Sequence, residues 1–372
     1  MKKLFLMLLC LPLLASCAGN TEEETGEPVF LNGQRFIGEG GMFLYEHADN
    51  FLWRVIFTDF ESLITLPVCP RPNCAHTDTS CSAIISIDPM AFGMPFIFYN
   101  NEKLYYNENF VEYIPDEENT QKTKPVYSTN LNQMDVYGMN RKLAATLEGK
   151  VFAEPFMIQG SSLYFIANDL SFNTSGNGLA DYYLYSFNFR NNKFTQLAHI
   201  DISERITFGG IFDGDMYFVT YFGGEKTLRF DREGGVLEET ELPYLSKFSE
   251  DFIIYWEDGE LYSINKENTV THLEGMTDIF KDTWVFEYIN DKQNWGMFNS
   301  FYPIMDNTVH LYAGEIGWDL NTNETFWINR EAITEYGNFV AMHDGYYIMG
   351  GWDGYRYVYY KVTAEELFQR QQ

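Results

Sequence analysis

The sequence has few basic residues and, beyond its start, no long hydrophobic run. Lysine and arginine total 25 against 53 aspartates and glutamates, which leaves a net charge of −28 at neutral pH. A field of this sign repels phosphate groups, so we expect no nucleic acid partner. It attracts cations and basic proteins, although solubility alone also accounts for a high negative charge. After residue 17, no stretch approaches the roughly 18 apolar residues that a membrane-spanning helix needs.

Motifs that mark common enzyme families are also missing. The sequence has no Gly-x-Ser-x-Gly nucleophile elbow, no Walker loop and no His-Glu-x-x-His motif. Residues 213–215 and 291–294 have the composition of calcium loops without the spacing or the closing glutamate, so turns explain them. The histidines outside the cysteine-rich stretch occur singly, at His47, His199, His272, His310 and His343. Scattered histidines are typical of packing or surface positions.

The first 17 residues resemble the leader of a bacterial lipoprotein. Two lysines precede an apolar run, residues 4–14, which is too short to cross a bilayer but suits a signal peptide. The run ends in Leu-Ala-Ser-Cys, which resembles the lipobox, a motif whose cysteine is lipidated after the chain is cut before it. The resemblance implies that Cys17 is the mature N-terminus and a membrane anchor. An ordinary signal peptide with an incidental cysteine is the alternative. Residues 18–28 are polar and acidic, which is typical of a flexible tether.

Aromatic residues make up 17% of the chain and recur in short hairpins. The clearest unit, residues 251–274, contains three alternating segments, with a type I′ turn at Asp258-Gly259 and a second turn at 266–268. Similar units begin near residues 43, 96, 156, 211, 302 and 339. Spread over residues 29–363, seven units have about 48 residues each, which is within the range for propeller blades.

This repetition predicts an all-β fold, because such units hide both apolar faces when they stack radially. We predict a β-propeller of about seven blades, six to eight, over residues 29–363. A two-sheet sandwich is the alternative. Thr363 and Glu366 fit a capping box, so residues 364–372 are expected to form a short helix or tail. Insertions at 107–129, 168–178 and 281–300 are expected to overhang the ring, where binding residues gather.

Three of the five cysteines lie close together, at Cys69, Cys74 and Cys81, with His76 between them. Three thiols and an imidazole suit a tetrahedral zinc ion, and four protein ligands would make the site structural rather than catalytic. The spacing C-x4-C-x-H-x4-C matches no standard zinc motif. Because exported chains meet oxidising conditions, one disulfide with a free thiol is an equal alternative.

A resemblance to a known family rests mainly on this cysteine loop. Such a segment after the first strands, in a chain with a lipobox and hairpins of the Asp-Gly-x-Leu-Tyr type, resembles a group of bacterial β-propeller lipoproteins of the TolB-like type. The resemblance covers most of the mature chain, although the repeat motif is loose. It brings no established activity and no catalytic residues.

Three tryptophans are candidates for a sugar-stacking surface: Trp295, Trp318 and Trp352. Trp352 falls in a glycine-rich stretch that reads as a turn, whereas packing between blades is the other explanation for all three. The sequence thus predicts a lipid-anchored, extracytoplasmic propeller of a bacterial cell envelope that binds a protein or a glycan. The alternatives are a lyase or glycosidase with its site in the central channel, or a structural part of an envelope assembly.

Overall fold

The fold was analysed in a computed structural model of the chain. It describes residues 29–31, 35–38, 40–49, 52–86, 95–115, 123–169, 181–200, 205–221, 226–242, 246–248, 251–258, 260–273, 308–311, 316–319, 324–328, 335–336, 338–352 and 357–369. The expected leader (1–17), the tether (18–28), all but the first two residues of the insertion at 168–178, and the insertion at 281–300 lie outside the described residues.

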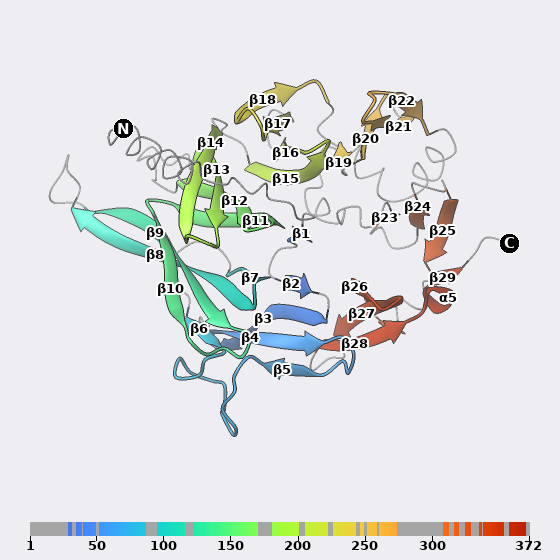
Figure 1. Cartoon of the computed structure of the whole chain (residues 1–372). Coiled ribbons are helices and arrows are strands. Elements are labelled where there is room, and N and C mark those ends of the chain that lie inside the picture. Colours follow the sequence, from blue (N-terminus) through green and yellow to red (C-terminus); the bar gives the residue numbers. More distant parts are fainter. Residues whose placement is uncertain are drawn as a thin grey trace, which may run out of the picture.

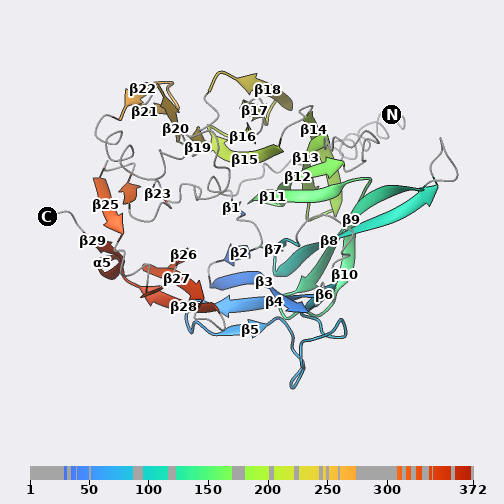
Figure 2. The ribbon, with the colours of Figure 1, turned by 180° about the vertical axis from the view of Figure 1, so that it is seen from behind.

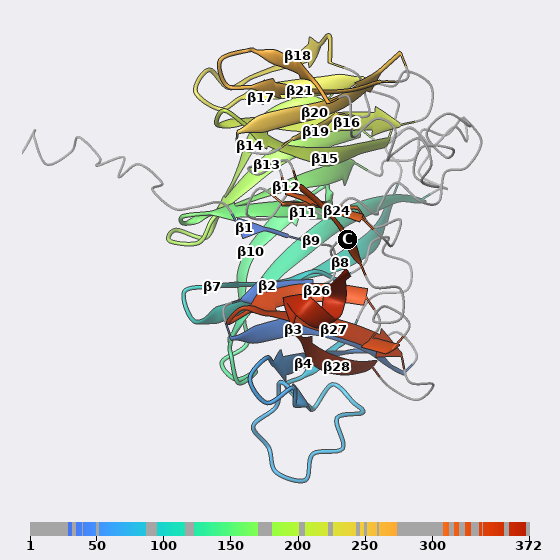
Figure 3. The same cartoon turned by 90° about the vertical axis from the view of Figure 1, so that its right-hand side faces the viewer.

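The protein is an all-β structure whose sheets are arranged around a ring as in a β-propeller (Figures 1 and 2). Neighbouring strands in every sheet are antiparallel, and successive sheets follow one another around the ring in chain order. Figure 3, seen edge on, shows that the strands of a sheet follow one another from the middle of the molecule to the rim. This arrangement agrees with the predicted fold class.

The first three sheets in chain order lie side by side. The first contains β2 (Arg35–Gly38), β3 (Gly41–Asp49), β4 (Leu52–Asp59), β5 (Thr65–Pro67) and β6 (Ile84–Ser86). The second contains β7 (Ile97–Asn100), β8 (Lys103–Pro115), β9 (Thr123–Asp135) and β10 (Lys142–Glu148). The third contains β11 (Val151–Gln159), β12 (Ser162–Asp169), β13 (Asp181–Asn188) and β14 (Lys193–Ile200).

Four further sheets complete the described part of the ring. They contain β15 (Arg205–Phe212), β16 (Asp215–Tyr221), β17 (Thr227–Asp231) and β18 (Val236–Thr240); β19 (Lys247–Phe248), β20 (Phe252–Glu257), β21 (Glu260–Asn265) and β22 (Val270–His272); β23 (Thr308–Leu311), β24 (Ile316–Asp319) and β25 (Glu324–Ile328); and β26 (Asn338–His343), β27 (Tyr346–Trp352) and β28 (Tyr357–Val362).

Both ends of the described chain add a strand to a sheet from another part of the sequence. The first strand, β1 (Val29–Phe30), pairs with β11 and lies near the middle of the ring (Figure 1). The last strand, β29 (Phe368–Gln369), pairs with β25. Between β28 and β29 lies a one-turn helix, α5 (Ala364–Leu367), in which Thr363 and Glu366 bond to each other's backbone N–H groups. Among the described residues, no helix is long and apolar enough to cross a membrane.

The hairpin turns follow from local sequence. The predicted unit at 251–274 forms β20, β21 and β22, and Asp258 has a φ of 50°, as a type I′ turn requires. Asp213 and Asp344 have the same left-handed conformation in corresponding turns. Aspartate tolerates this conformation because its short polar side chain can bond to nearby backbone groups. The predicted strand–turn–strand pattern is confirmed here.

The hydrophobic core is divided among the spaces between neighbouring sheets. The largest cluster joins the first three sheets, with Phe98, Phe152 and Phe165 fully buried. A second cluster joins the sheet of β11–β14 to that of β15–β18. A further one joins the first and the last sheets through Met42 and Ile348. At these junctions each sheet covers the apolar face of its neighbour, which is how a ring of sheets satisfies the hydrophobic effect.

Two details differ from the sequence-based prediction. The insertion at 107–129 is not a separate loop: much of it continues β8 and β9, which pair from Lys103↔Asp135 to Pro115↔Thr123 as one long arm. Trp352, expected in a turn, ends β27 and pairs with Tyr357. In both cases, cross-strand hydrogen bonding to a partner overrides the local preference of polar or glycine-rich sequence for a loop.

Candidate metal centre and neighbouring groove

The cysteine loop leaves the rim of the first sheet and returns to it. Strands β5 and β6 both pair with β4, and the loop between them projects from the rim (Figures 1 and 3). The buried residue Val55 holds both ends: its carbonyl accepts from Val68 N–H at 3.0 Å, and its own N–H donates to the Ala83 carbonyl at 2.8 Å. The loop is therefore closed at its base before any metal binds.

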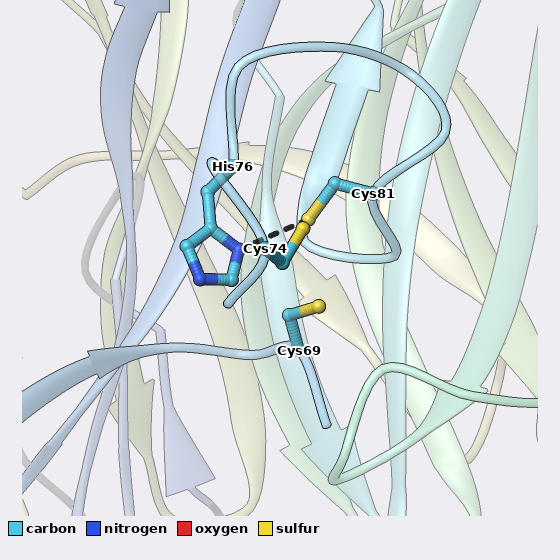
Figure 4. A group of neighbouring side chains, drawn as sticks. All are labelled: Cys69, Cys74, His76 and Cys81. Carbon is cyan, nitrogen blue, oxygen red and sulfur yellow. Dashed lines mark hydrogen bonds between the residues drawn. The ribbon is translucent and has the colours of Figure 1, made fainter. Parts of the chain in front are cut away.

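Within this loop, Cys69, Cys74, His76 and Cys81 come together (Figure 4). Their ligand atoms all lie within 4.8 Å of one another, and His76 Nδ1 lies 3.2 Å from Cys81 Sγ. In a tetrahedral site with Zn–S bonds of about 2.3 Å, neighbouring sulfur atoms are about 3.8 Å apart. Atoms this close together match the size of a tetrahedral zinc site.

The backbone helps to aim the histidine. His76 has a φ of 53°, a left-handed conformation that is uncommon for histidine, and its carbonyl accepts a hydrogen bond from Arg54 Nε at 3.2 Å. Arg54 also bonds to Glu46 at 3.1 Å. These contacts hold the imidazole on the side of the loop where the thiols lie.

The two outer cysteines differ in acidity. Burial by itself raises the pKa of the Cys69 thiol, but hydrogen bonds from the Arg71 backbone and the Ser82 hydroxyl outweigh it and lower that pKa to about 7. Burial raises the pKa of Cys81 to about 12. Of these two thiols, Cys69 more readily gives the thiolate that a metal ion needs.

The four side chains fit a structural metal ion. All three thiols are free in the structure, with Cys81 buried and the other two partly buried. Three sulfur ligands and one nitrogen ligand match the preference of zinc, and four protein ligands leave no open position for substrate. The predicted grouping of these residues is present.

The second sheet supports this loop from behind. Arg141 Nη2 donates to the Ile84 carbonyl at 2.9 Å, and its guanidinium lies 5.2 Å from the ring centre of Tyr106. Burial raises the pKa of Tyr106 to about 12, so its hydroxyl stays neutral. Gly138, in the turn after β9, comes so close that a Cβ atom there would lie 2.2 Å from the Val68 carbonyl oxygen. The loop is thus packed against a neighbouring blade.

A groove of about 1040 Å³ begins at the cysteine loop and is formed by parts of the first three sheets. We call it the interblade groove. Most of its lining is apolar or aromatic, from Phe36, Gly40, Gly41, Phe43, Phe57, Leu66, Pro67, Val68, Pro70, Tyr99, Val136, Tyr137, Ile158 and Gly160; the rest is Asp59, Cys69, Asn100 and Asn101. Cys69 belongs to both the metal cluster and the groove.

Two polar residues of the groove have distinctive surroundings. Hydrogen bonds from the hydroxyl and the backbone N–H of Ser62, both 2.7 Å long, lower the pKa of Asp59, so it carries a negative charge at neutral pH. Asn100 donates to the Gly160 carbonyl at 3.2 Å, but its buried Oδ1 atom has no partner in the described part of the chain. An unsatisfied buried acceptor costs about 1–3 kcal/mol.

A second group of possible metal ligands lies where the first and last sheets meet. Glu61, His343 and Asp344 have ligand atoms within 4.8 Å of one another, on partly or fully exposed side chains. Glu61 already accepts a hydrogen bond from Lys361 at 2.7 Å. Because a cation from the protein occupies this carboxylate, we assign no metal to the group.

The remaining predicted site residues are dispersed. Cys17 and Trp295 lie outside the described residues. Trp318 pairs with Val309 and Thr325 in β24, whereas Trp352 belongs to β27 in another sheet. The sequence-based reasoning missed the groove entirely. Its only local signals were the Gly40-Gly41 and Asn100-Asn101 turns, which read as ordinary hairpin connections.

No protein family model and no curated protein matches the sequence. Among solved structures, an oligogalacturonate lyase in complex with manganese has 9% identity and a TM-score of 0.41, over 91% of this chain and 97% of the lyase. An oligogalacturonate lyase from Vibrio parahaemolyticus has 14% identity and a TM-score of 0.36, over 64% of each chain, which is less than two thirds of that enzyme. TolB from Acinetobacter baumannii has 12% identity and a TM-score of 0.28, over 88% of this chain and 79% of TolB. Similarities this weak say nothing about activity.

Proposed function

We propose that the protein is a lipid-anchored, extracytoplasmic propeller of seven blades that binds a protein or glycan ligand in a bacterial cell envelope. A zinc ion held by Cys69, Cys74, His76 and Cys81 would stiffen the cysteine loop, and the interblade groove would take part of the ligand. Cys17 would carry the lipid anchor. No residue of the chain is given a catalytic role.

The observation that carries the binding proposal is the position of Cys69, which lines the groove and also belongs to the four-ligand cluster. A closed four-ligand site suits a structural ion rather than a catalytic one. A large, mainly apolar groove beside it is the usual form of a ligand site. A metal-stiffened wall would keep such a groove open before the ligand arrives, which reduces the entropy lost on binding.

The zinc part of the proposal is tested by elemental analysis and thiol titration of the purified chain. We expect one zinc per chain and no disulfide, with three thiols titrated once the chelated chain is unfolded. The disulfide alternative would be supported instead if the chain contained no metal after growth with added zinc and peptide mass spectrometry found a Cys–Cys bond.

The binding part is tested with an array of envelope glycans and purified envelope proteins, probed with the wild type and with Gly40→Leu. Gly40 lines the groove and no atom lies within 4 Å of a Cβ built on it, so a larger side chain can be placed there without a clash at Cβ. A ligand that binds the wild type and is lost in this variant supports the proposal. Release of new reducing ends or unsaturated sugars would support the lyase or glycosidase alternative instead.

The anchor is tested by incorporation of a labelled fatty acid. We expect label in the wild type and none in Cys17→Ala, with the variant released from the membrane fraction.

We also propose a sugar-stacking surface formed by Trp295, Trp318 and Trp352. A change in tryptophan fluorescence on addition of glycan would support it. Replacing each by alanine without loss of glycan binding would remove it.

A further inference from the structure

Four aromatic residues of the interblade groove form one continuous cluster. The ring of Phe43 lies 4.7 Å from that of Phe57 and 6.3 Å from that of Tyr99, and Phe36 lies 6.0 Å from Tyr99. All four line the groove. Because the faces of aromatic rings carry partial negative charge, such a cluster attracts an ammonium group as well as an apolar body.

The polar atoms of the groove match a ligand that donates hydrogen bonds. Asp59 supplies a carboxylate, and Asn100 and Asn101 are the lining residues with amide side chains. No lysine, arginine or histidine is among the described residues that line the groove; His343, outside this lining, contributes to the lowered pKa of Asp59. The described lining therefore offers no cation to the Asp59 carboxylate, and a ligand with a positive charge and N–H donors would pair with it.

The charge of the whole chain acts in the same direction. A net charge of −28 raises the local concentration of cations and repels anions. Acidic sugars and phosphorylated ligands are therefore disfavoured in this groove. A neutral sugar would use the rings and the amide, but would leave the carboxylate without a counter-charge.

We propose that the interblade groove binds an organic cation: a protonated amine carried on an apolar or aromatic body. The apolar body packs on the cluster of Phe36, Phe43, Phe57 and Tyr99, and the ammonium group is held by the Asp59 carboxylate. The inference rests on the binding function proposed above, and it names the class of ligand that the interblade groove would bind.

The test is calorimetric titration of the full chain with three probes of the same shape: phenethylammonium chloride, neutral 2-phenylethanol and sodium phenylacetate. We expect phenethylammonium to bind at least tenfold more tightly than the alcohol, and phenylacetate to bind most weakly. Asp59→Asn should weaken phenethylammonium binding about tenfold and leave the alcohol unchanged. Gly40→Leu should weaken both.

The matched control is Asp78→Asn. Asp78 is exposed on the cysteine loop and accepts a hydrogen bond from the Ser80 backbone, as Asp59 does from Ser62, but it does not line the groove. This variant removes one negative charge from the chain, as Asp59→Asn does, so it measures the effect of net charge on probe binding by itself. We expect it to bind phenethylammonium within twofold of the wild type.

Several outcomes would overturn the inference. Equal binding of the alcohol and the ammonium probe would make the groove an apolar or glycan site. Equal effects of Asp59→Asn and Asp78→Asn would reduce the preference to net charge. Absence of binding by any probe would also end the proposal. These failures are separate from that of the general function, since a glycan or protein ligand lost in Gly40→Leu would still support binding at the groove.

Discussion

Lys361 Nζ lies 2.7 Å from the Glu61 carboxylate, although the two residues are 300 positions apart in the sequence. Glu61 follows β4 in the first sheet and Lys361 belongs to β28 in the last, so this ion pair spans the closure of the ring. Beneath it, Met42 and Phe60 of the first sheet pack with Val340, Ile348 and Tyr359 of the last. Closure therefore depends on an apolar interface with a polar contact at its edge.

The ion pair is expected to make a small, pH-dependent contribution to stability. The hydrogen bond from Lys361 and its charge lower the pKa of Glu61. A carboxyl with a lowered pKa stabilises the folded state above its unfolded pKa, and this contribution is lost as the pH falls below about 4. Lys361→Met should therefore lower the melting temperature at pH 7 by up to about 2 °C, and by less at pH 3.

The same loss at both pH values would contradict this electrostatic account. It would point instead to the stem of Lys361, whose ammonium lies 5.8 Å from the ring centre of Tyr346. The double variant with Glu61→Gln serves as the control and should be no less stable than Lys361→Met alone.

The apolar part of the closure is expected to matter much more. Ile348 is fully buried between the two sheets. Ile348→Ala should lower the free energy of unfolding by about 2–5 kcal/mol, because it removes buried methyl groups and leaves a cavity. Urea unfolding measures this loss. Val270→Ala, at an exposed position of β22, should stay within about 0.5 kcal/mol of the wild type. Similar values for both variants would mean that the ring is not closed at Ile348.

Metal binding is expected to stabilise the chain through the cysteine loop. With zinc at 100 times its dissociation constant, the gain is about 2.7 kcal/mol. His76→Ala should abolish this zinc-dependent shift of the melting temperature. The control is His272→Ala, which should leave the shift intact. The His272 ring bonds to Glu260 on the exposed side of another sheet. A shift that survives in His76→Ala would remove this histidine from the site.

The thiols are expected to differ in reactivity once the metal is removed. With a pKa of about 7, Cys69 should reach half its maximal rate of alkylation by iodoacetamide near pH 7, whereas Cys81, with a pKa of about 12, should stay unreactive there. Peptide mass spectrometry follows each residue. Ser82→Ala removes a hydrogen bond that lowers the pKa of Cys69, so the midpoint should move to higher pH. Equal rates for both thiols would refute the difference.

The packing of the loop against the second sheet is tested at two glycines with similar backbones. Gly138 and Gly149 have φ of 78° and 71°, but only at Gly138 would a Cβ meet another atom, the Val68 carbonyl oxygen. Gly149→Ala should cost about 1 kcal/mol from its backbone conformation alone. Gly138→Ala should cost more and weaken zinc binding, because it displaces the base of the loop. Equal losses and unchanged zinc affinity would show that the loop is independent of its neighbour.

Local chemistry made the repeating units predictable. An aspartate-glycine turn between alternating apolar segments specifies a hairpin within a few residues, and the unit at 251–274 folds accordingly. The grouping of Cys69, Cys74, His76 and Cys81 also followed from spacing, because residues within one short loop cannot separate far. The tryptophans illustrate the opposite case: Trp318 and Trp352 are 34 positions apart and belong to different sheets, so composition alone gave no distance between them.

Only the tertiary structure decided the contacts between blades. No local pattern encodes the proximity of the residues that these contacts join. Examples are the two hydrogen bonds by which Val55 closes the loop, the pairing of β1 with β11, and the Glu61–Lys361 contact. The interblade groove arises in the same way, from hairpin tips of three sheets that meet at one edge. The sequence determined the individual hairpins because turn and strand preferences act over a few residues. The ring and the groove were decided by the burial of apolar faces against distant parts of the chain.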